Sequence, residues 1–147
     1  MDYDNPWTYK NKNFTSDDIK NSLCFVYIIT NTINNKKYIG KKTFVNILRV
    51  KQGTRKLKKT VKKESDWKKY YGSSKSLLAD VKEYGKENFS RQILHLCHKK
   101  SLATYHEARE QFSRKVLEKE DYYNEWIFCR IVKSNIIEKK KGDNSDE

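Results

Sequence analysis

Two short apolar runs separated by an asparagine-rich turn decide the fold: residues 23–30 are LCFVYIIT, residues 31–35 are NTINN and residues 37–42 are KYIGKK. The first run is rich in β-branched and aromatic residues and has the length of a strand. Asparagine tolerates left-handed backbone angles and hydrogen-bonds its own backbone, so residues 31–35 predict a turn. The second run then returns as a strand, and the pair is predicted to be an antiparallel hairpin.

A helix and a third strand are predicted downstream of the hairpin. The apolar side chains of residues 75–84 recur at helical spacing. Ser73 or Ser74 precedes this helix as an N-cap, and Gly85 ends it as a C-cap. Residues 89–97 (FSRQILHLC) then have the composition of a strand.

The last part of the chain predicts a second helix and one more apolar element. Residues 101–117 predict the helix, with an expected buried stripe of Leu102, Tyr105, Phe112, Val116 and Leu117. Residues 122–132 (YYNEWIFCRIV) predict a short helix or an edge strand. This order of elements predicts an α+β fold, in which a small three-stranded antiparallel sheet is flanked by helices.

The length and the ends of the chain suggest one folded unit. A chain of 147 residues has the size of a single domain. We expect that domain over residues 21–132, after a loosely attached arm of residues 1–20 and before a charged tail of residues 133–147. No apolar run approaches the ~20 residues of a membrane span, and the N-terminus is too polar for a secretory signal. We therefore expect a cytoplasmic protein without membrane partners.

Charge is the strongest global signal in the sequence. There are 32 Lys and Arg residues against 19 Asp and Glu residues, a formal net charge of +13. A folded domain this basic usually binds a polyanion, most often nucleic acid. The alternative is a basic surface that only keeps the protein soluble.

A basic insertion at residues 43–64 follows the hairpin. Residues 41–63 contain ten basic residues and no acidic residue, with apolar residues interleaved in the first half. This pattern is typical of an extended loop or a β-ribbon, and the alternative is a disordered charged segment. The residues expected to contact DNA are Lys41, Lys42, Arg55, Lys56, Lys58, Lys59, Lys62 and Lys63, together with Ser73, Ser74 and Lys75.

Two tyrosines are the candidates for chemistry. Tyr27 and Tyr38 lie on the two strands of the hairpin, eleven residues apart, so both phenols can reach one face. A phenol can relay a proton from water if nearby cations lower its pKa, and Lys41 and Lys42 are close in sequence. The alternative is that both tyrosines are ordinary core residues.

Residues 25–27 (FVY) and 38–40 (YIG), with the asparagines between them, resemble the hairpin of the GIY-YIG nuclease superfamily. The eleven-residue spacing of the two tyrosines agrees with that family. Three further stretches resemble phage-encoded free-standing homing endonucleases of this type: residues 67–74 (WKKYYGSS), residues 84–89 (YGKENF) and residues 105–112 (YHEAREQF). The resemblance covers about residues 23–131.

The resemblance implies hydrolysis of a DNA phosphodiester with one divalent metal, Mg²⁺ or Mn²⁺. It implies that Glu107 is the metal ligand, with Glu110 as the rival one turn later on the same helix. It also implies that Tyr27 is the general base toward water and that Tyr38 orients or deprotonates that water.

The resemblance implies accessory roles as well, and the chain departs from the family at two points. Asn124 would hold the site together or contact phosphate, and His106 could assist proton transfer. The first motif begins with Phe25 where the family has Gly. The family also carries an Arg on a helix soon after the second motif. Arg49 is the nearest arginine in spacing, and Lys41 or Lys42 are the substitutes.

Several functions stay open on the sequence alone. The first is a phage homing-type endonuclease acting in the host cytoplasm, and a restriction or repair nuclease is a variant of it. The second is a noncatalytic nucleic-acid-binding protein that keeps the fold. Sixteen residues follow Ile131, too few for a separate DNA-binding domain. We therefore expect selectivity from the basic insertion, from the arm, or from the second subunit of a homodimer.

Overall fold

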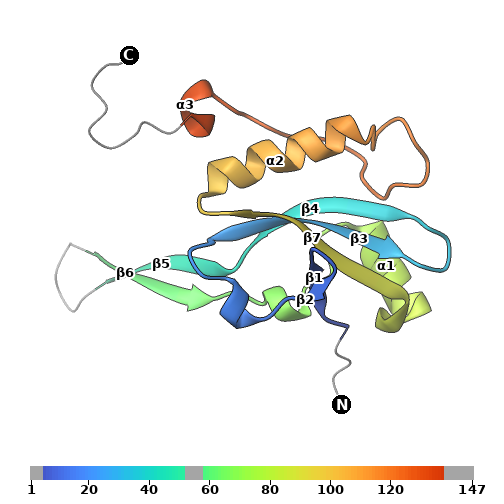
Figure 1. Ribbon diagram of the computed structural model, residues 1–147, viewed down its shortest axis with the longest axis horizontal. Helices are drawn as coiled ribbons and strands as arrows, with labels where there is room; N and C mark the ends of the chain where they lie inside the picture. Colours follow the sequence, from blue (N-terminus) through green and yellow to red (C-terminus); the bar gives the residue numbers. More distant parts are fainter. Residues whose placement is uncertain (1–4, 52–57, 138–147) are drawn as a thin grey trace.

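The computed structural model describes residues 5–51 and 58–137. Its main sheet has the strand order β2-β1-β7-β3-β4 (Figure 1). The strands are β1 (Trp7–Tyr9), β2 (Lys12–Asn13), β3 (Cys24–Asn31), β4 (Lys37–Thr43) and β7 (Phe89–Cys97). β3 pairs antiparallel with both β4 and β7, whereas β1 pairs parallel with β7.

The predicted hairpin is confirmed as β3 and β4. In its register Tyr27 lies opposite Gly40 and Ile28 lies opposite Ile39. The turn uses the asparagines as expected, because the Asn31 side-chain oxygen accepts a hydrogen bond from the Ile33 backbone at 2.9 Å. Asn35 adopts a left-handed φ of 63°.

β3 is buried on both faces and divides the core into two clusters. Phe25, Tyr27 and Ile29 point into one cluster, which also contains Trp7, Trp67 and Leu77. Val26 and Ile28 point into the other cluster, which includes Ala103 of the second helix. Alternate residues of a strand face opposite sides, so one central strand organises both halves of the core.

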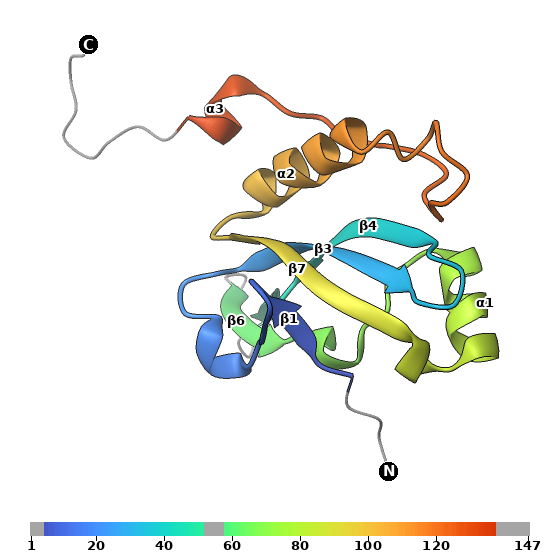
Figure 2. The same cartoon turned by 45° about the vertical axis from the view of Figure 1, so that its right-hand side comes forward.

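The two longest helices pack on opposite faces of the main sheet. The helices are η1 (Ser16–Asp18), η2 (Trp67–Lys69), α1 (Lys75–Tyr84), η3 (Lys86–Asn88), α2 (Lys100–Ser113) and α3 (Lys133–Ile136). α2 lies across one face of the sheet (Figure 2). The predicted caps of α1 are confirmed, since the Ser74 hydroxyl accepts from the Leu77 backbone and Gly85 has a φ of 93°.

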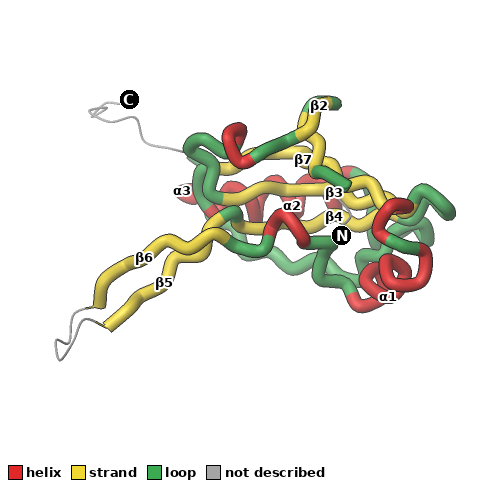
Figure 3. The backbone as a smooth tube through the Cα atoms, turned by 90° about the horizontal axis from the view of Figure 1, so that it is seen from below, coloured by secondary structure: helices red, strands yellow, loops and turns green. Residues whose placement is uncertain are grey.

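The basic insertion forms a two-stranded ribbon. β5 (Val45–Lys51) pairs antiparallel with β6 (Lys58–Glu64), and the ribbon projects away from the main sheet (Figure 3). The ribbon alternative of the sequence prediction is therefore confirmed for these strands. Arg55 and Lys56, which we expect to contact DNA, lie outside the described residues.

The three-stranded sheet predicted from the sequence is wrong, because the N-terminal segment adds two strands. Trp7 is 2% exposed, and its ring packs edge-on against Phe25 and Tyr27 at centroid distances of 5.0 and 5.4 Å. Its indole N–H donates to the Trp67 carbonyl at 2.8 Å. These contacts hold β1 beside β7, so residues 7–14 are not a loosely attached arm.

The second helix is shorter than predicted, and the predicted buried stripe is right only in part: Val116, which lies beyond the helix end, is buried and Leu102 packs against the second core cluster. α2 ends at Ser113, and Lys115 just beyond it has a left-handed φ of 56°. Phe112 and Leu117 of the predicted stripe are 62% and 50% exposed. The buried residues of the helix are Ala103, Ala108 and Gln111. The small side chains of Ala103 and Ala108 let α2 lie close to the sheet. A search for a stripe of large apolar residues does not find this kind of contact.

The segment after α2 is mostly irregular. Tyr122 makes a single parallel bridge to Lys37, and the Tyr123 N–H donates to the Lys37 carbonyl at 2.7 Å. Residues 124–132 form neither the helix nor the strand predicted for them. Among the described residues, no helix combines the length and apolar character needed to cross a membrane.

Candidate nuclease site

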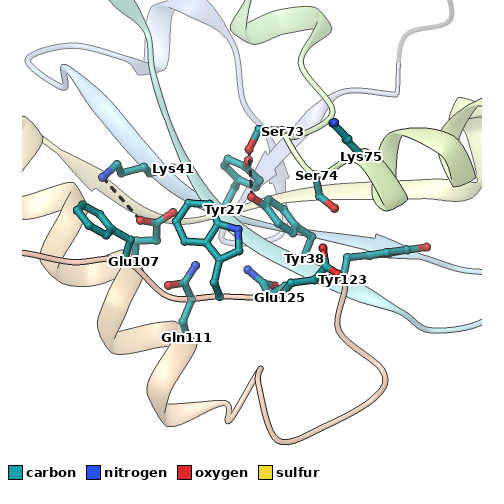
Figure 4. Close-up of a pocket in the computed structure, with 13 residues that line it drawn as sticks. Tyr27, Tyr38, Lys41, Ser73, Ser74, Lys75, Glu107, Gln111, Tyr123 and Glu125 are labelled. Carbon is teal, nitrogen blue, oxygen red and sulfur yellow. Dashed lines mark hydrogen bonds and ion pairs between the residues drawn. The ribbon is translucent and has the colours of Figure 1, made fainter.

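A pocket of about 480 Å³ lies beside β4, one of the two edge strands of the main sheet. β4, the N-terminus of α1, the middle of α2 and residues 123–128 form its walls (Figure 4). The residues that line it are Tyr27, Tyr38, Lys41, Ser73, Ser74, Lys75, Glu107, Gln111, Tyr123, Asn124, Glu125, Trp126 and Phe128. The pocket therefore brings together Tyr27, Tyr38, Glu107 and Asn124, the main residues implied by the resemblance.

Tyr27 reaches the pocket through the space that Gly40 leaves. A Cβ atom at Gly40 would lie 2.5 Å from the Tyr27 hydroxyl oxygen and 2.7 Å from its Cζ atom. Only glycine fits under the phenol at this position. The Tyr27 hydroxyl is fully buried and makes no hydrogen bond of ordinary geometry within the described part of the chain. A buried polar atom without a partner carries an energetic cost and is common at functional sites.

The expectation that cations lower the pKa of Tyr27 is wrong for this structure. Burial, followed by the neighbouring phenols of Tyr70 and Tyr38, holds the pKa of Tyr27 well above its ordinary value. Lys42 is also engaged elsewhere, because its ammonium lies 2.7 Å from Asp66 and over the ring of Tyr70. Tyr27 is a neutral phenol at neutral pH.

Tyr38 presents its hydroxyl at the other side of the pocket. The Tyr38 and Ser73 hydroxyls are hydrogen-bonded at 3.1 Å. Burial raises the pKa of Tyr38, and the Ser73 hydrogen bond opposes that rise. Ser73 comes from the segment before α1, so the hydrogen bond ties β4 to the N-terminus of that helix (Figure 4).

Glu107 is the carboxylate of α2 that faces the pocket. Its side chain is 16% exposed, and its Oε1 atom lies 3.7 Å from the Lys41 ammonium. Burial raises the pKa of Glu107, while Lys41 acts in the opposite direction. Lys41 also donates to the Thr104 hydroxyl at 2.8 Å, which fixes the ammonium beside the carboxylate.

Glu110 and His106 lie outside this pocket. The Glu110 Oε2 atom lies 2.6 Å from the His95 Nε2 atom, and the Glu110 Oε1 atom accepts a hydrogen bond from the Arg114 Nε at 3.0 Å. His106 stacks on His95 with ring centroids 4.4 Å apart. Burial and then the charge on His95 lower the pKa of His106. The structure thus separates Glu110 and His106 from Glu107, although all three belong to one helix.

Asn124 supports the site by closing the open edge of β4. Its side-chain oxygen accepts from the Ile39 N–H at 3.0 Å, and its amide donates to the Ile39 carbonyl at 2.9 Å. Gln111 donates to the same carbonyl at 3.0 Å. These two amides satisfy backbone groups that an unpaired edge strand would otherwise leave open.

The basic residues divide between the pocket and the ribbon. Lys41 and Lys75 line the pocket together with Ser73 and Ser74. Arg49 is exposed on β5 and does not line the pocket, so the structure does not support a role for it beside the tyrosines. The expected DNA contacts Lys62 and Lys63 are exposed on β6, where Lys58 and Lys59 also lie.

Sequence reasoning missed five residues of the pocket: Gln111, Tyr123, Glu125, Trp126 and Phe128. Gln111 follows Glu107 by four residues, so helical spacing alone could have placed both side chains on one face. Tyr123, Trp126 and Phe128 come from an irregular segment, where no periodic pattern predicts the direction of a side chain.

The donor set of the pocket fits a magnesium or manganese ion. Mg²⁺ usually keeps several waters and is held by one or two carboxylates plus substrate phosphates. Glu107 supplies one partly desolvated carboxylate inside the pocket. Within the described ranges, no three His, Cys, Asp or Glu side chains group into an all-protein metal site. DNA phosphates would therefore have to complete the coordination.

Comparisons with known proteins agree with the geometry. Residues 7–127 match the family described as "Putative endonuclease segE, GIY-YIG domain". The chain is 34% identical over 100 residues to a protein of Enterobacteria phage T4 named "Putative endonuclease segE". That match covers 68% of this chain and 39% of the phage protein, so the chain spans about two fifths of its curated relative. No solved structure matches it.

Proposed function

The chain belongs to the GIY-YIG family of the segE type, and from that premise we propose that it is a metal-dependent endonuclease that hydrolyses DNA phosphodiester bonds. The observation that carries the proposal is the meeting of Tyr27, Tyr38 and Glu107 in one pocket. A protein that only binds nucleic acid has no need of a largely buried carboxylate in one pocket with two phenols and a lysine.

The tyrosines are the groups that handle the proton of the attacking water. Hydrolysis forms a bond from the water oxygen to phosphorus and breaks the bond to the leaving oxygen, so the water must lose a proton. The Tyr27 hydroxyl lines the pocket and makes no hydrogen bond of ordinary geometry in the described part of the chain, so it is placed to accept that proton. Because the pKa of Tyr27 is raised, the neutral phenol takes up the proton of the water only as it gives its own proton to the neighbouring Tyr70 hydroxyl and from there to solvent. The leaving oxygen takes a proton from solvent. Tyr38 orients the same water.

Lys41 and Lys75 are the groups that stabilise negative charge on the phosphate. Both line the pocket, and Lys75 is the first residue of α1, where the free backbone N–H groups of a helix also favour anions. Lys41 replaces Arg49 in our assignment, because Arg49 lies on the ribbon. A fixed cation acts most strongly where charge develops in the transition state.

Glu107 is the residue that would hold the divalent metal. A bound Mg²⁺ would supply positive charge to the phosphate oxygens and to the leaving group. Without a metal, the Lys41 ammonium, 3.7 Å away, partly compensates the negative charge of the Glu107 carboxylate. Asn124 keeps β4 in place and does not need to touch the substrate.

The test is metal-dependent nicking of a supercoiled plasmid by two isosteric variants. Glu107→Gln should abolish Mg²⁺-dependent cleavage and leave DNA affinity largely intact, since the amide keeps the packing and loses the ligand charge. Glu110→Gln is the matched control, three residues away on the same helix. It should cut at close to the wild-type rate, because Glu110 is occupied by His95 and Arg114.

Three outcomes would count against this assignment. Loss of cleavage in Glu110→Gln alone would move the metal ligand by one turn. Wild-type cleavage in both variants would show that neither glutamate holds the metal. No metal-dependent cleavage by the wild type would favour the noncatalytic nucleic-acid-binding protein.

For the biological role, we propose a homing-type nuclease of a phage. The proposal is supported by the relative from Enterobacteria phage T4. Digestion of a random DNA library and sequencing of the ends would test it, because a homing enzyme cuts at a few long preferred sites. Cleavage that tracks DNA structure without sequence preference would favour a repair-type enzyme.

A further inference from the structure

Two large aromatic side chains stand exposed at the rim of the pocket. Trp126 is 71% exposed and Phe128 is 75% exposed, and both line the pocket. Neither contributes much to the core, so folding does not explain their presence. Single exposed apolar residues are ordinary, but two beside a candidate active site call for a partner.

The backbone that carries these two side chains is anchored on both sides of Trp126. Asn124 clamps the N–H and the carbonyl of Ile39. Ile127, which lies between the two aromatics, packs against the hydrophobic cluster under α2. The two rings are therefore presented to solvent from a fixed segment, and a partner does not have to order the chain first.

The charge around the two rings favours an anionic partner. Lys41 and Lys75 line the same pocket, and the whole chain carries a net charge of +13. Glu107 and Glu125 also line it. A lysine-bearing pocket with aromatic rings at its rim matches the surfaces that bind nucleic-acid strands by phosphate contact and base stacking.

We propose that Trp126 and Phe128 are a stacking platform for unpaired nucleobases beside the scissile phosphate. This inference rests on the proposed function and names its substrate class: DNA that presents unpaired nucleotides beside the scissile bond, as a bubble does, within the preferred sites of a homing-type enzyme. Bases inside a duplex have both faces covered by their neighbours, so only an unpaired base can place a face on Trp126 or Phe128.

The first measurement is equilibrium binding to two synthetic DNAs of equal length, in the Glu107→Gln background so that neither is cut. One is a fully paired duplex and the other carries a short central bubble. The bubble DNA should bind more tightly. Trp126→Ala and Phe128→Ala should each weaken bubble binding by about 5- to 100-fold, and the preference over duplex should shrink accordingly.

The second measurement reports stacking directly. The fluorescent base 2-aminopurine, placed in the bubble, should be quenched on binding and should recover its emission in Trp126→Ala. Trp126→Phe should restore part of the affinity, because it keeps an aromatic face. Phe112→Ala is the matched control: Phe112 is 62% exposed on α2 and does not line the pocket, so its loss should not alter bubble binding.

Each outcome separates this inference from the proposed function. Bubble preference and quenching without any metal-dependent cutting would support the stacking platform and contradict the proposed endonuclease activity. Cutting with equal affinity for both DNAs, unaffected by Trp126→Ala, would overturn the platform alone. A concentration-dependent dimer that Trp126→Ala dissociates would also overturn it, because the rings would then belong to an interface between two copies.

Discussion

At the scale of single residues, the site depends on small and polar side chains placed where backbone or phenol groups need them. Gly40 leaves room for the Tyr27 ring, and Asn124 pairs with Ile39 as a neighbouring strand would. Neither residue has to touch DNA to be required. Substitutions at the two positions therefore separate positioning from chemistry.

Tyr27→Phe should lower the rate of cleavage and leave the fold at least as stable. The rate at saturating DNA should fall by roughly 10²-fold or more, as expected for loss of a general base. The free energy of unfolding should stay equal or rise, because the variant removes a buried hydroxyl without a well-formed partner. Single-turnover nicking and urea unfolding measure the two effects. Tyr84→Phe, on α1 away from the pocket, is the control, and full activity in Tyr27→Phe would show that the phenol is only packed.

Asn124→Asp should be about as damaging as Asn124→Ala, although it is nearly isosteric. Aspartate can still accept from the Ile39 N–H, but its second oxygen faces the Ile39 carbonyl, to which the amide now donates at 2.9 Å. Each variant should lose about 1–3 kcal/mol in the free energy of unfolding. Urea titration at neutral pH provides the measurement. A fully stable Asn124→Asp would mean that the clamp on Ile39 contributes little.

At the scale of elements, the sequence predicted correctly the helices and strands that are marked by nearby turn residues, caps and apolar spacing. The hairpin and α1 have turn residues, caps and periodic apolar positions within a few residues of one another, as at Asn31, Ser74 and Gly85. The buried face of α2 was predicted only in part: Leu102 packs on the core as expected, but the contact with the sheet uses Ala103 and Ala108 and leaves Phe112 in solvent. That choice depends on the surface α2 packs against, which no local pattern contains.

The candidate site also contains residues that the sequence identified and residues that only the structure shows. The resemblance named Tyr27, Tyr38 and Glu107, and all three line one pocket. It could not name Trp126 or Phe128, because their exposure follows from the anchoring of Ile127 on a distant cluster. Arg49 was the nearest arginine in sequence, yet it lies on β5 and does not line the pocket of the tyrosines. The ribbon of β5 and β6 projects away from β3 and β4 (Figure 3).

The ribbon should supply much of the salt dependence of DNA binding. If five of its cations contact phosphates, the slope of log affinity against log salt should include about −4 to −5 from this element. Changing Lys56, Lys58, Lys59, Lys62 and Lys63 to Gln should flatten the slope and weaken binding to all sequences alike, with little change in the single-turnover rate at saturating DNA.

The control for the ribbon variant neutralises five exposed lysines elsewhere: Lys10, Lys12, Lys82, Lys115 and Lys119. Fluorescence anisotropy over a salt series measures both proteins. Equal slopes in the two variants would mean that the charge of the ribbon acts only through the net charge of the molecule.

At the scale of the whole molecule, the N-terminal segment completes the core. Trp7 contacts Phe25, Tyr27 and the Trp67 carbonyl, and Arg91 lies between the rings of Trp7 and Tyr71 at 4.8 and 4.2 Å. The Arg91 guanidinium also donates to the Lys68 and Tyr70 carbonyls. Strand β7, the loop before α1 and the N-terminal strand β1 are thus packed together behind the tyrosines.

Trp7→Ala should cost about 3–5 kcal/mol in the free energy of unfolding, since it empties a large volume in the core. Trp126→Ala is the matched control and should change stability by no more than about 0.5 kcal/mol, because Trp126 is 71% exposed. Urea unfolding followed by circular dichroism measures both. Similar losses in the two variants would contradict the placement of Trp7 in the core.

The parallel pairing of β1 with β7 also affects when a newly made chain can assemble its pocket. β1 can pair with β2 early, but it cannot pair with β7 until Arg91 and its neighbours have emerged from the ribosome. Glu107 and Asn124 are synthesised later still, whereas both hairpin tyrosines are made early. A half-synthesised chain therefore exposes the tyrosines without the carboxylate or the clamp on β4. The proposed nuclease would thus remain harmless during translation, since its pocket closes only when most of the chain has left the ribosome.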